Sequence, residues 1–153
     1  MDNIYPVITL YQPWATWIMR EWKTIETRTH PRFSSLQHKT ILIHAGMKTD
    51  DSDYSVKNPY LSKEQISQNP DEMVNGFILG SVFVSGFNSL YESHSKASLI
   101  DCKDTQRWGL FLENIKKFDN PIPCKGEMGI WYFDMKKSEK VKKKRTETLK
   151  LPF

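Results

Sequence analysis

The densest group of side chains that could do chemistry lies in the six residues KTIETR, from Lys23 to Arg28. Residues 24–29 are rich in β-branched side chains and alternate in character, which is typical of a strand. In a strand, Glu26 and Arg28 share one face with Thr24, and Lys23 lies at the entrance to that face. A carboxylate and a guanidinium one pleat apart can position the edge of a base or a phosphate group. The alternative is an exposed ion pair beside a lysine, worth at most about 1 kcal/mol.

A second polar segment, QPWA at residues 12–15, precedes the first along the chain. Pro13 suits the first turn of a helix, and Trp14 then lies near backbone N–H groups that have no partner within the helix. An anion or a carbonyl group can bind at such a place, and the indole can stack on a base. The alternative is that Trp14 belongs to the hydrophobic core.

The other residues with suitable chemistry do not form recognisable sites. No glycine-rich loop is followed by Lys and Ser or Thr, and no GxSxG motif surrounds a serine. These absences argue against a nucleoside triphosphatase and a serine hydrolase. We expect neither a metal nor another cofactor, because no HxxH, HExxH or CxxC spacing occurs among the histidines and cysteines, which are His30, His38, His44, His94, Cys102 and Cys124.

One helix and the strand before it must hold the two segments in place. Residues 7–10 are β-branched and predict a short strand, which leads directly into a helix over residues 13–22. In that helix the apolar residues recur near i, i+3, i+4 and i+8, so one face is apolar. The helix should pack on a sheet and bury Trp17 and Ile18.

Further strands are predicted along the rest of the chain. Residues 40–45 form one, and residues 76–87 form a central strand because apolar side chains lie on both of its faces. Between them we expect a loop and one short surface helix, where Ser62 and Gln65 have the spacing of a capping box. Later strands are predicted at residues 108–111, 115–118 and 130–133, broken by Pro121, Pro123, Gly126 and Gly129. At least five short strands with one strong helix favour an α+β fold, a small β-barrel with helical decoration.

The composition is that of one soluble globular domain. The chain has 153 residues, of which 39% are hydrophobic and 26% charged, so it can bury a core without disulfides. Two cysteines are too few for a disulfide framework and indicate a reducing compartment. The first residues lack the pattern of a signal peptide, and no run of roughly 18 apolar residues occurs. We therefore expect a cytoplasmic protein that does not enter a membrane.

Charge is unevenly distributed along the chain. The formal net charge is +4, yet residues 136–153 contain eight Lys or Arg against two Glu, so residues 1–135 carry −2. The last segment has few apolar residues and a run of like charges, which predicts a flexible tail. We expect one domain over residues 1–135 and a basic tail over residues 136–153. The tail serves solubility or contacts nucleic-acid phosphates without sequence specificity.

Five short motifs occur in an order that resembles a known family. They are QPWA at residues 12–15, KTIETR at 23–28, HAG at 44–46, GFILGSV at 76–82 and KGEMGIW at 125–131. The series is similar to the ASCH domain (activating signal cointegrator homology), which belongs to the PUA-like superfold. The resemblance covers about residues 7–133. It implies a PUA-like β-barrel with an N-terminal helix packed beside it, short surface helices, and a cleft lined by the KxxExR segment.

The resemblance also implies a function, which is RNA or nucleotide binding and, in some members, hydrolysis of an acetylated cytidine or cleavage of RNA. Lys23, Glu26 and Arg28 match the lysine, acidic and basic positions of the family signature. The members that remove an acetyl group have a threonine in place of Glu26, and that threonine is the proposed nucleophile. Thr24 lies one pleat away on the same strand face and cannot replace it without rearrangement.

Together these observations predict a binding module for RNA or a nucleotide, including one with a modified base. The alternative is a small metal-independent hydrolase acting on a modified nucleoside or on RNA, with Lys23 as an activated amine and Glu26 as general base. A third hypothesis is a protein-interaction adaptor without a small ligand. The residues expected to contact the ligand are Gln12, Trp14, Lys23, Glu26, Arg28, His44 and Trp108.

Overall fold

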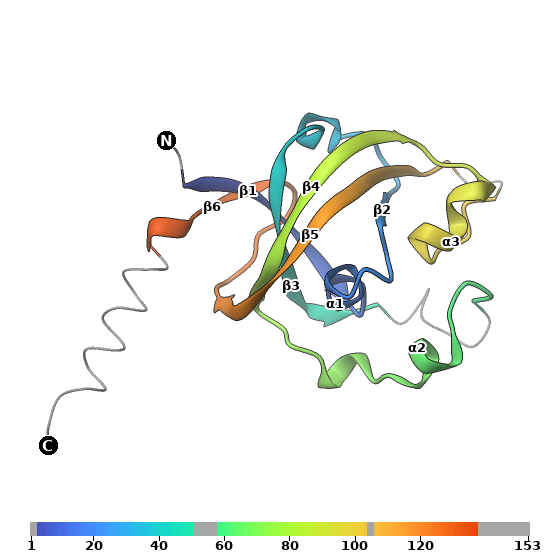
Figure 1. The fold of residues 1–153 in the computed structure, drawn as a ribbon, viewed down its shortest axis with the longest axis horizontal. Helices are drawn as coiled ribbons and strands as arrows, with labels where there is room; N and C mark the ends of the chain where they lie inside the picture. The colour runs from blue at the N-terminus through green and yellow to red at the C-terminus, as the bar shows by residue number, and fades with distance from the viewer. Residues whose placement is uncertain (1–2, 51–57, 104–105, 138–153) are drawn as a thin grey trace, which may run out of the picture.

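The computed structural model describes residues 3–50, 58–103 and 106–137 of the chain. Six strands form a single curled sheet in the order β2-β5-β4-β3-β1-β6 (Figure 1). Strands β1 and β3 are parallel, and the other neighbouring pairs are antiparallel. The result is a half-closed barrel with short helices, which confirms the predicted α+β class. The strand bounds are β1 Ile4–Gln12, β2 Ile25–Arg28, β3 Thr40–Thr49, β4 Phe77–Ser89, β5 Trp108–Pro123 and β6 Trp131–Asp134.

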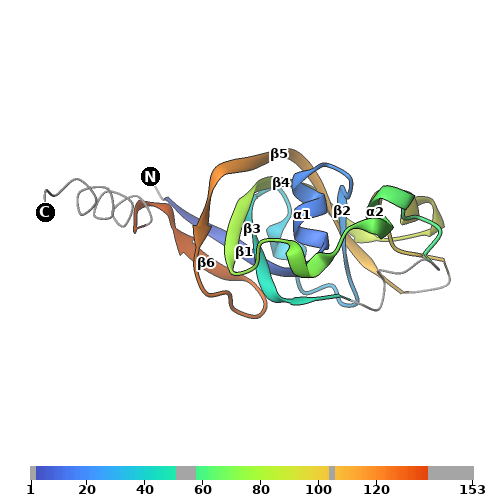
Figure 2. The same ribbon diagram turned by 90° about the horizontal axis from the view of Figure 1, so that it is seen from below.

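Helix α1, Trp14–Met19, fills the concave side of the sheet. Figure 2 shows the helix inside the curve made by β4 and β5. Its residues Ala15, Ile18 and Met19 are buried in the main core, and Trp17 is fully buried in a second cluster beside it. The burial of Trp17 and Ile18 confirms the prediction that this helix packs on a sheet.

Helix α1 is shorter than the predicted span of residues 13–22. Glu21 has a φ of 62°, which lies in the left-handed region and ends the helical path. The backbone N–H groups of Trp22 and Lys23 then both donate to the carbonyl of Trp17, at 3.0 and 3.2 Å. This turn sends the chain from α1 straight into β2, so the KTIETR segment starts beside the helix.

Strand β4 is central, between β3 and β5, as the apolar residues on both of its faces predict. Strand β5 differs from the prediction of two separate strands at residues 108–111 and 115–118, because it runs without a break from Trp108 to Pro123. Two prolines are tolerated there because β2 pairs with residues 108–111 and the Thr24 carbonyl accepts from the N–H of Leu112, whereas the described residues pair no further strand with this edge of β5 near the prolines. Pro121 also lies within a shift in register between β4 and β5, between the paired residues Lys117 and Ile122.

Short helices cover the open side of the curled sheet. Helix α2, Lys63–Ser67, begins at a capping box in which Ser62 and Gln65 bond to one another's backbone, as predicted. Helix α3, Ser95–Ser98, lies beside β2 and follows the turn η3, Glu92–His94. Two further turns of 3-10 helix are η1, Ser34–Leu36, and η2, Pro70–Glu72.

The described residues contain no helix that is long and apolar enough to cross a membrane. Of the predicted basic tail, only Lys136 and Lys137 fall within the described residues. The remainder, residues 138–153, lies outside them, so the tail stays a prediction from the sequence.

Candidate functional site

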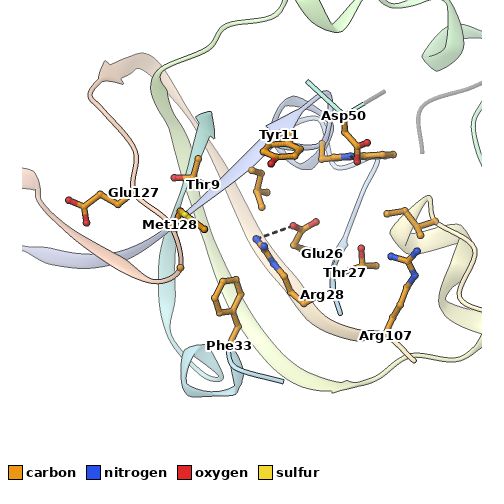
Figure 3. A pocket seen from close by; sticks show the side chains of 14 residues that line it. Thr9, Tyr11, Glu26, Thr27, Arg28, Phe33, Asp50, Arg107, Glu127 and Met128 are labelled. Atoms are coloured by element: carbon orange, nitrogen blue, oxygen red, sulfur yellow. Dashed lines mark hydrogen bonds and ion pairs between the residues drawn. The ribbon is translucent and has the colours of Figure 1, made fainter. Parts of the chain in front are cut away.

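A cleft of about 370 Å³ opens beside strand β2. Figure 3 shows charged side chains projecting into it from both sides of that strand. The lining comes from segments far apart in the sequence: Thr9, Leu10, Tyr11, Trp14, Glu26, Thr27, Arg28, Phe33, Asp50, Ile100, Arg107, Glu127, Met128 and Gly129. Such a volume is at the lower end of the range for small-molecule sites, so the cleft suits one nucleotide-sized group rather than a duplex.

Glu26 lies between two cations. Its Oε1 is 3.7 Å from Lys23 Nζ, and its Oε2 is 3.4 Å from Arg28 Nη2. The Glu26 side chain is 9% exposed and that of Arg28 is 22% exposed, whereas Lys23 is completely buried. The order of burial, from Lys23 outward to Arg28, places the carboxylate where it can reach both the interior and the cleft.

Lys23 is held from several directions beneath the cleft. Its Nζ donates to the carbonyl of Ser98 on α3 and lies 5.0 Å from the centre of the Trp14 ring. Lys23 does not line the cleft. A buried ammonium group needs a counter-charge and hydrogen-bond acceptors around it. Lys23 therefore helps to hold Glu26 and Trp14 in position from the interior side of the cleft.

Arg28 is only partly satisfied by its neighbours. Its guanidinium carbon lies 4.4 Å from the centre of the Phe33 ring, which supports the planar group by a cation–π contact. Its Nε and Nη2 atoms are buried and have no hydrogen-bond partner among the described residues. Nη2 is also the atom near Glu26, at ion-pair distance. Buried donors without acceptors are uncommon in proteins, and each calls for a partner.

Arg107 approaches the same cleft from the other side of β2. Residues Arg28 and Trp108 are paired in the sheet, as are Thr27 and Gly109. Side chains alternate along a strand, so Thr27 and Arg107 share the face opposite to Glu26 and Arg28. Figure 3 shows this arrangement. Arg107 Nε is also buried without a hydrogen-bond partner among the described residues.

Aromatic and polar groups complete the lining. Trp14, the first residue of α1, is buried, and its Nε1 donates to Asp50 Oδ2 at 2.8 Å. Its ring also meets the edge of Trp17, with ring centres 5.5 Å apart. Tyr11 is 48% exposed, so it offers an open aromatic surface where Trp14 does not. Met128 is almost completely exposed at the opposite end of the lining.

Gln12 and Trp108, two residues expected at the site, do not line the cleft. Gln12 is fully buried, and both ends of its amide are used: Nε2 donates to the carbonyl of Val74 at 2.8 Å, and Oε1 accepts from the N–H of Thr16 at 3.0 Å. It fixes the start of α1 at the end of β1. Trp108 is half-buried against the main core.

His44 also lies outside the cleft, in a buried network on β3. Its Nε2 is 2.9 Å from the carbonyl oxygen of Cys124, and its Nδ1 is 3.2 Å from Thr9 Oγ1. A carbonyl only accepts, so Nε2 carries the proton and Nδ1 accepts from the threonine hydroxyl. Trp131 Nε1 in turn donates to that hydroxyl oxygen at 3.1 Å. Burial lowers the pKa of the His44 imidazole, and its bond to the Cys124 carbonyl acts in the opposite direction.

This network positions the loop between β5 and β6, which carries three cleft residues, Glu127, Met128 and Gly129. Gly126 lies so close to the network that a Cβ atom there would be 2.6 Å from His44 Cε1 and 2.7 Å from Thr9 Oγ1. Only glycine lets the loop pass this near to the ring. In the described residues, no three His, Cys, Asp or Glu side chains converge to hold a metal ion.

Several lining residues were not predicted from the sequence. Tyr11 directly precedes the QPWA motif, and it lies two residues after Thr9 on β1, so the alternation of a strand puts the two side chains on one face. Arg107 and Asp50 carry no local signal, because they reach the cleft only through the pairing of distant strands.

Neither a protein-family model nor a curated protein matches the chain. Among solved structures, the chain is similar to an ASCH protein from Zymomonas mobilis, with a TM-score of 0.58 and 13% identity over 93% of this chain and 96% of that one. The chain has an ASCH-like fold. A serine-to-alanine variant of that protein matches with a TM-score of 0.52 and 14% identity, covering 92% of this chain and 94% of that one. A tyrosine-to-phenylalanine variant matches with a TM-score of 0.52 and 11% identity, covering 90% and 96%. In this ASCH-like fold the cleft beside β2 is lined by Glu26, Thr27 and Arg28 together with residues from β1, from the loop between β5 and β6, and with Arg107 just before β5.

Proposed function

We propose that the protein binds RNA or a nucleotide by holding one unstacked base, and its adjoining phosphate or sugar, in the cleft beside β2. The observation that carries this proposal is the state of Arg28. Its buried Nε and Nη2 donors have no hydrogen-bond partner among the described residues, and the Arg28 side chain lines an open cleft. A ligand with phosphate or carbonyl oxygens supplies the missing acceptors.

Glu26 provides the complementary chemistry. A carboxylate accepts hydrogen bonds from the amino and imino groups on the edge of a base, as acidic side chains do with the amino group of cytosine. Because Lys23 and Arg28 flank this carboxylate, it is held ready in one orientation. Acceptor and donors side by side match the mixed donor and acceptor edge of a nucleobase, and the open ring of Tyr11 supplies a surface for stacking.

The same geometry favours binding over hydrolysis by the lysine. An amine nucleophile must reach the substrate, yet Lys23 is completely buried, donates to the carbonyl of Ser98 and does not line the cleft. Glu26 does line the cleft, so a general-base role is tested by turnover. Incubation with N4-acetylcytidine or a short RNA, followed by mass spectrometry, should return the ligand unchanged.

The binding test is fluorescence anisotropy with a labelled, short single-stranded RNA of mixed sequence. Arg28→Met should weaken binding about tenfold or more, because it removes the guanidinium donors while keeping an unbranched aliphatic side chain at this position. Arg32→Met is the matched control, since Arg32 is exposed and lies outside the cleft. It removes the same charge and should change the affinity by less than about twofold.

Equal losses in the two variants would mean that net charge, and not the cleft, determines binding. Undiminished binding by Arg28→Met would refute the site. Thermal melting of each variant, followed by circular dichroism, checks that the fold is retained.

A further inference from the structure

Arg107 belongs to two hollows at once. It lines the cleft beside β2, and it also lines a second hollow of about 570 Å³ between the end of β4 and the start of β5. The two hollows are therefore neighbours, joined at the arginine. A ligand that fills the first and extends past Arg107 enters the second.

The second hollow carries the side chains that suit a single strand of nucleic acid. Tyr91 is 67% exposed, and its ring lies near that of His94 with centres 6.1 Å apart, so the side chain keeps surface that is open to stacking. Lys103 and Gln106 are exposed beside it and offer donors to phosphate and base oxygens. Glu92 is the acidic group on this lining, set against the two cations Lys103 and Arg107. An aromatic platform next to basic groups is the usual means of binding unpaired nucleotides.

Arg107 itself is positioned but unsatisfied. Its carbonyl accepts from the N–H of Leu90 at 2.8 Å, which fixes the backbone at the start of β5. Its Nε is buried, with no hydrogen-bond partner among the described residues. A planar guanidinium whose Nε–H has no acceptor among the described residues matches the geometry of a phosphate group.

We infer that the ligand is a single-stranded segment of at least two nucleotides, in which Arg107 holds the phosphodiester between a base in the cleft and a neighbouring nucleotide stacked on Tyr91. This inference rests on the proposed function and adds the ligand's class to it. The phosphate contact serves equally a free nucleotide or an RNA strand, whereas the stack on Tyr91 requires a strand.

The test compares three ligands by isothermal titration calorimetry: uridine, its 3′-monophosphate and the dinucleoside monophosphate UpU, with the same series for the other bases. Wild-type protein should bind the monophosphate about tenfold more tightly than the nucleoside, and the dinucleotide about tenfold more tightly again. Arg107→Met should remove most of both gains, so that its affinities for nucleoside, monophosphate and dinucleotide differ by less than about threefold. Tyr91→Ala should remove only the gain of the dinucleotide.

Matched controls are Arg32→Met and Tyr132→Ala, an exposed tyrosine on β6 that lines neither hollow. Both should keep the full series of affinities. Equal affinities for nucleoside, monophosphate and dinucleotide in the wild type would overturn the inference and leave the proposed function standing. A gain for the monophosphate without a further gain for UpU would overturn the two-nucleotide site. No binding by any of these ligands or by RNA would refute the proposed function itself.

Discussion

At the scale of single residues, the protein keeps a carboxylate between a fully buried lysine and a partly exposed arginine. Removing one member of a buried pair strands the other charge in the interior. Glu26 therefore has two structural roles, since it is the counter-charge of Lys23 and also lines the cleft. Stability and binding are linked at this residue more than at Arg28, whose side chain is more exposed.

We predict that Glu26→Gln lowers the free energy of unfolding by about 3 kcal/mol, because Lys23 loses its counter-charge while the shape is preserved. Urea denaturation measures this effect. Glu113→Gln, an exposed glutamate on β5, is the control and should change stability by less than about 0.5 kcal/mol. The double variant Lys23→Met with Glu26→Gln should be less destabilised than the sum of the two single variants. Strict additivity would contradict the pairing.

The local part of the candidate site was accessible from the sequence, and the distant part was not. Glu26 and Arg28 lie two residues apart, and the period of a strand alone puts them on one face. The burial of Lys23 could not be predicted, because it depends on α3 and on Trp14. His44 was expected at the site because of its motif. Its position is instead set by contacts with Thr9 and Cys124, which no local pattern encodes.

At the scale of elements, β3 holds the loop between β5 and β6 through His44. The pKa of His44 is lowered by burial, so the unfolded chain binds a proton more readily than the folded one. The contribution of His44 to the free energy of unfolding is complete above the ordinary histidine pKa of about 6.5. It is lost as the pH falls from there through the lowered pKa of the folded state.

We expect the urea midpoint of the wild type to decrease as the pH is lowered from about 7.5 to 5.5, and the midpoint of His44→Gln to change less. Glutamine keeps a donor near the carbonyl of Cys124 but does not titrate. His30 is the control, because burial and the charges of Arg32 and Arg28 also lower its pKa, so it contributes in the same direction. His30→Gln should leave most of the pH dependence in place. If the pH dependence of stability survives in His44→Gln and disappears in His30→Gln, it arises from His30, and the prediction for His44 is wrong.

Elements with a strong apolar pattern were predictable. Residues 40–45 and 76–87 are rich in apolar and β-branched side chains, and both lie mainly in strands in the structure. The continuity of β5 was not predictable, because a proline in a sequence usually marks the end of a strand. Here the edge of β5 that no further described strand pairs near the prolines, and its bulged pairing with β4, accommodate them, and both features arise only from the complete sheet.

At the scale of the whole molecule, basic charge is concentrated in the last residues of the sequence. Residues 138–153 contain six Lys or Arg and two Glu. We predict that truncation after Lys137 leaves the melting temperature nearly unchanged, because the segment has few apolar residues. It should reduce the slope of log Kd against log salt for RNA, since fewer phosphates are neutralised. Calorimetry and anisotropy at several salt concentrations measure the two effects. A large loss of melting temperature would mean that this segment packs on the domain.

The central claim is that the cleft beside β2 is where the nucleotide binds. The most direct test is nuclear magnetic resonance of the nitrogen-labelled protein titrated with a dinucleotide such as UpU. We predict that backbone shifts concentrate at Glu26, Thr27 and Arg28, and that the Nε–H signals of Arg28 and Arg107 move as their donors gain acceptors. Shifts confined to the opposite side of the sheet, with both arginine signals unmoved, would contradict the account.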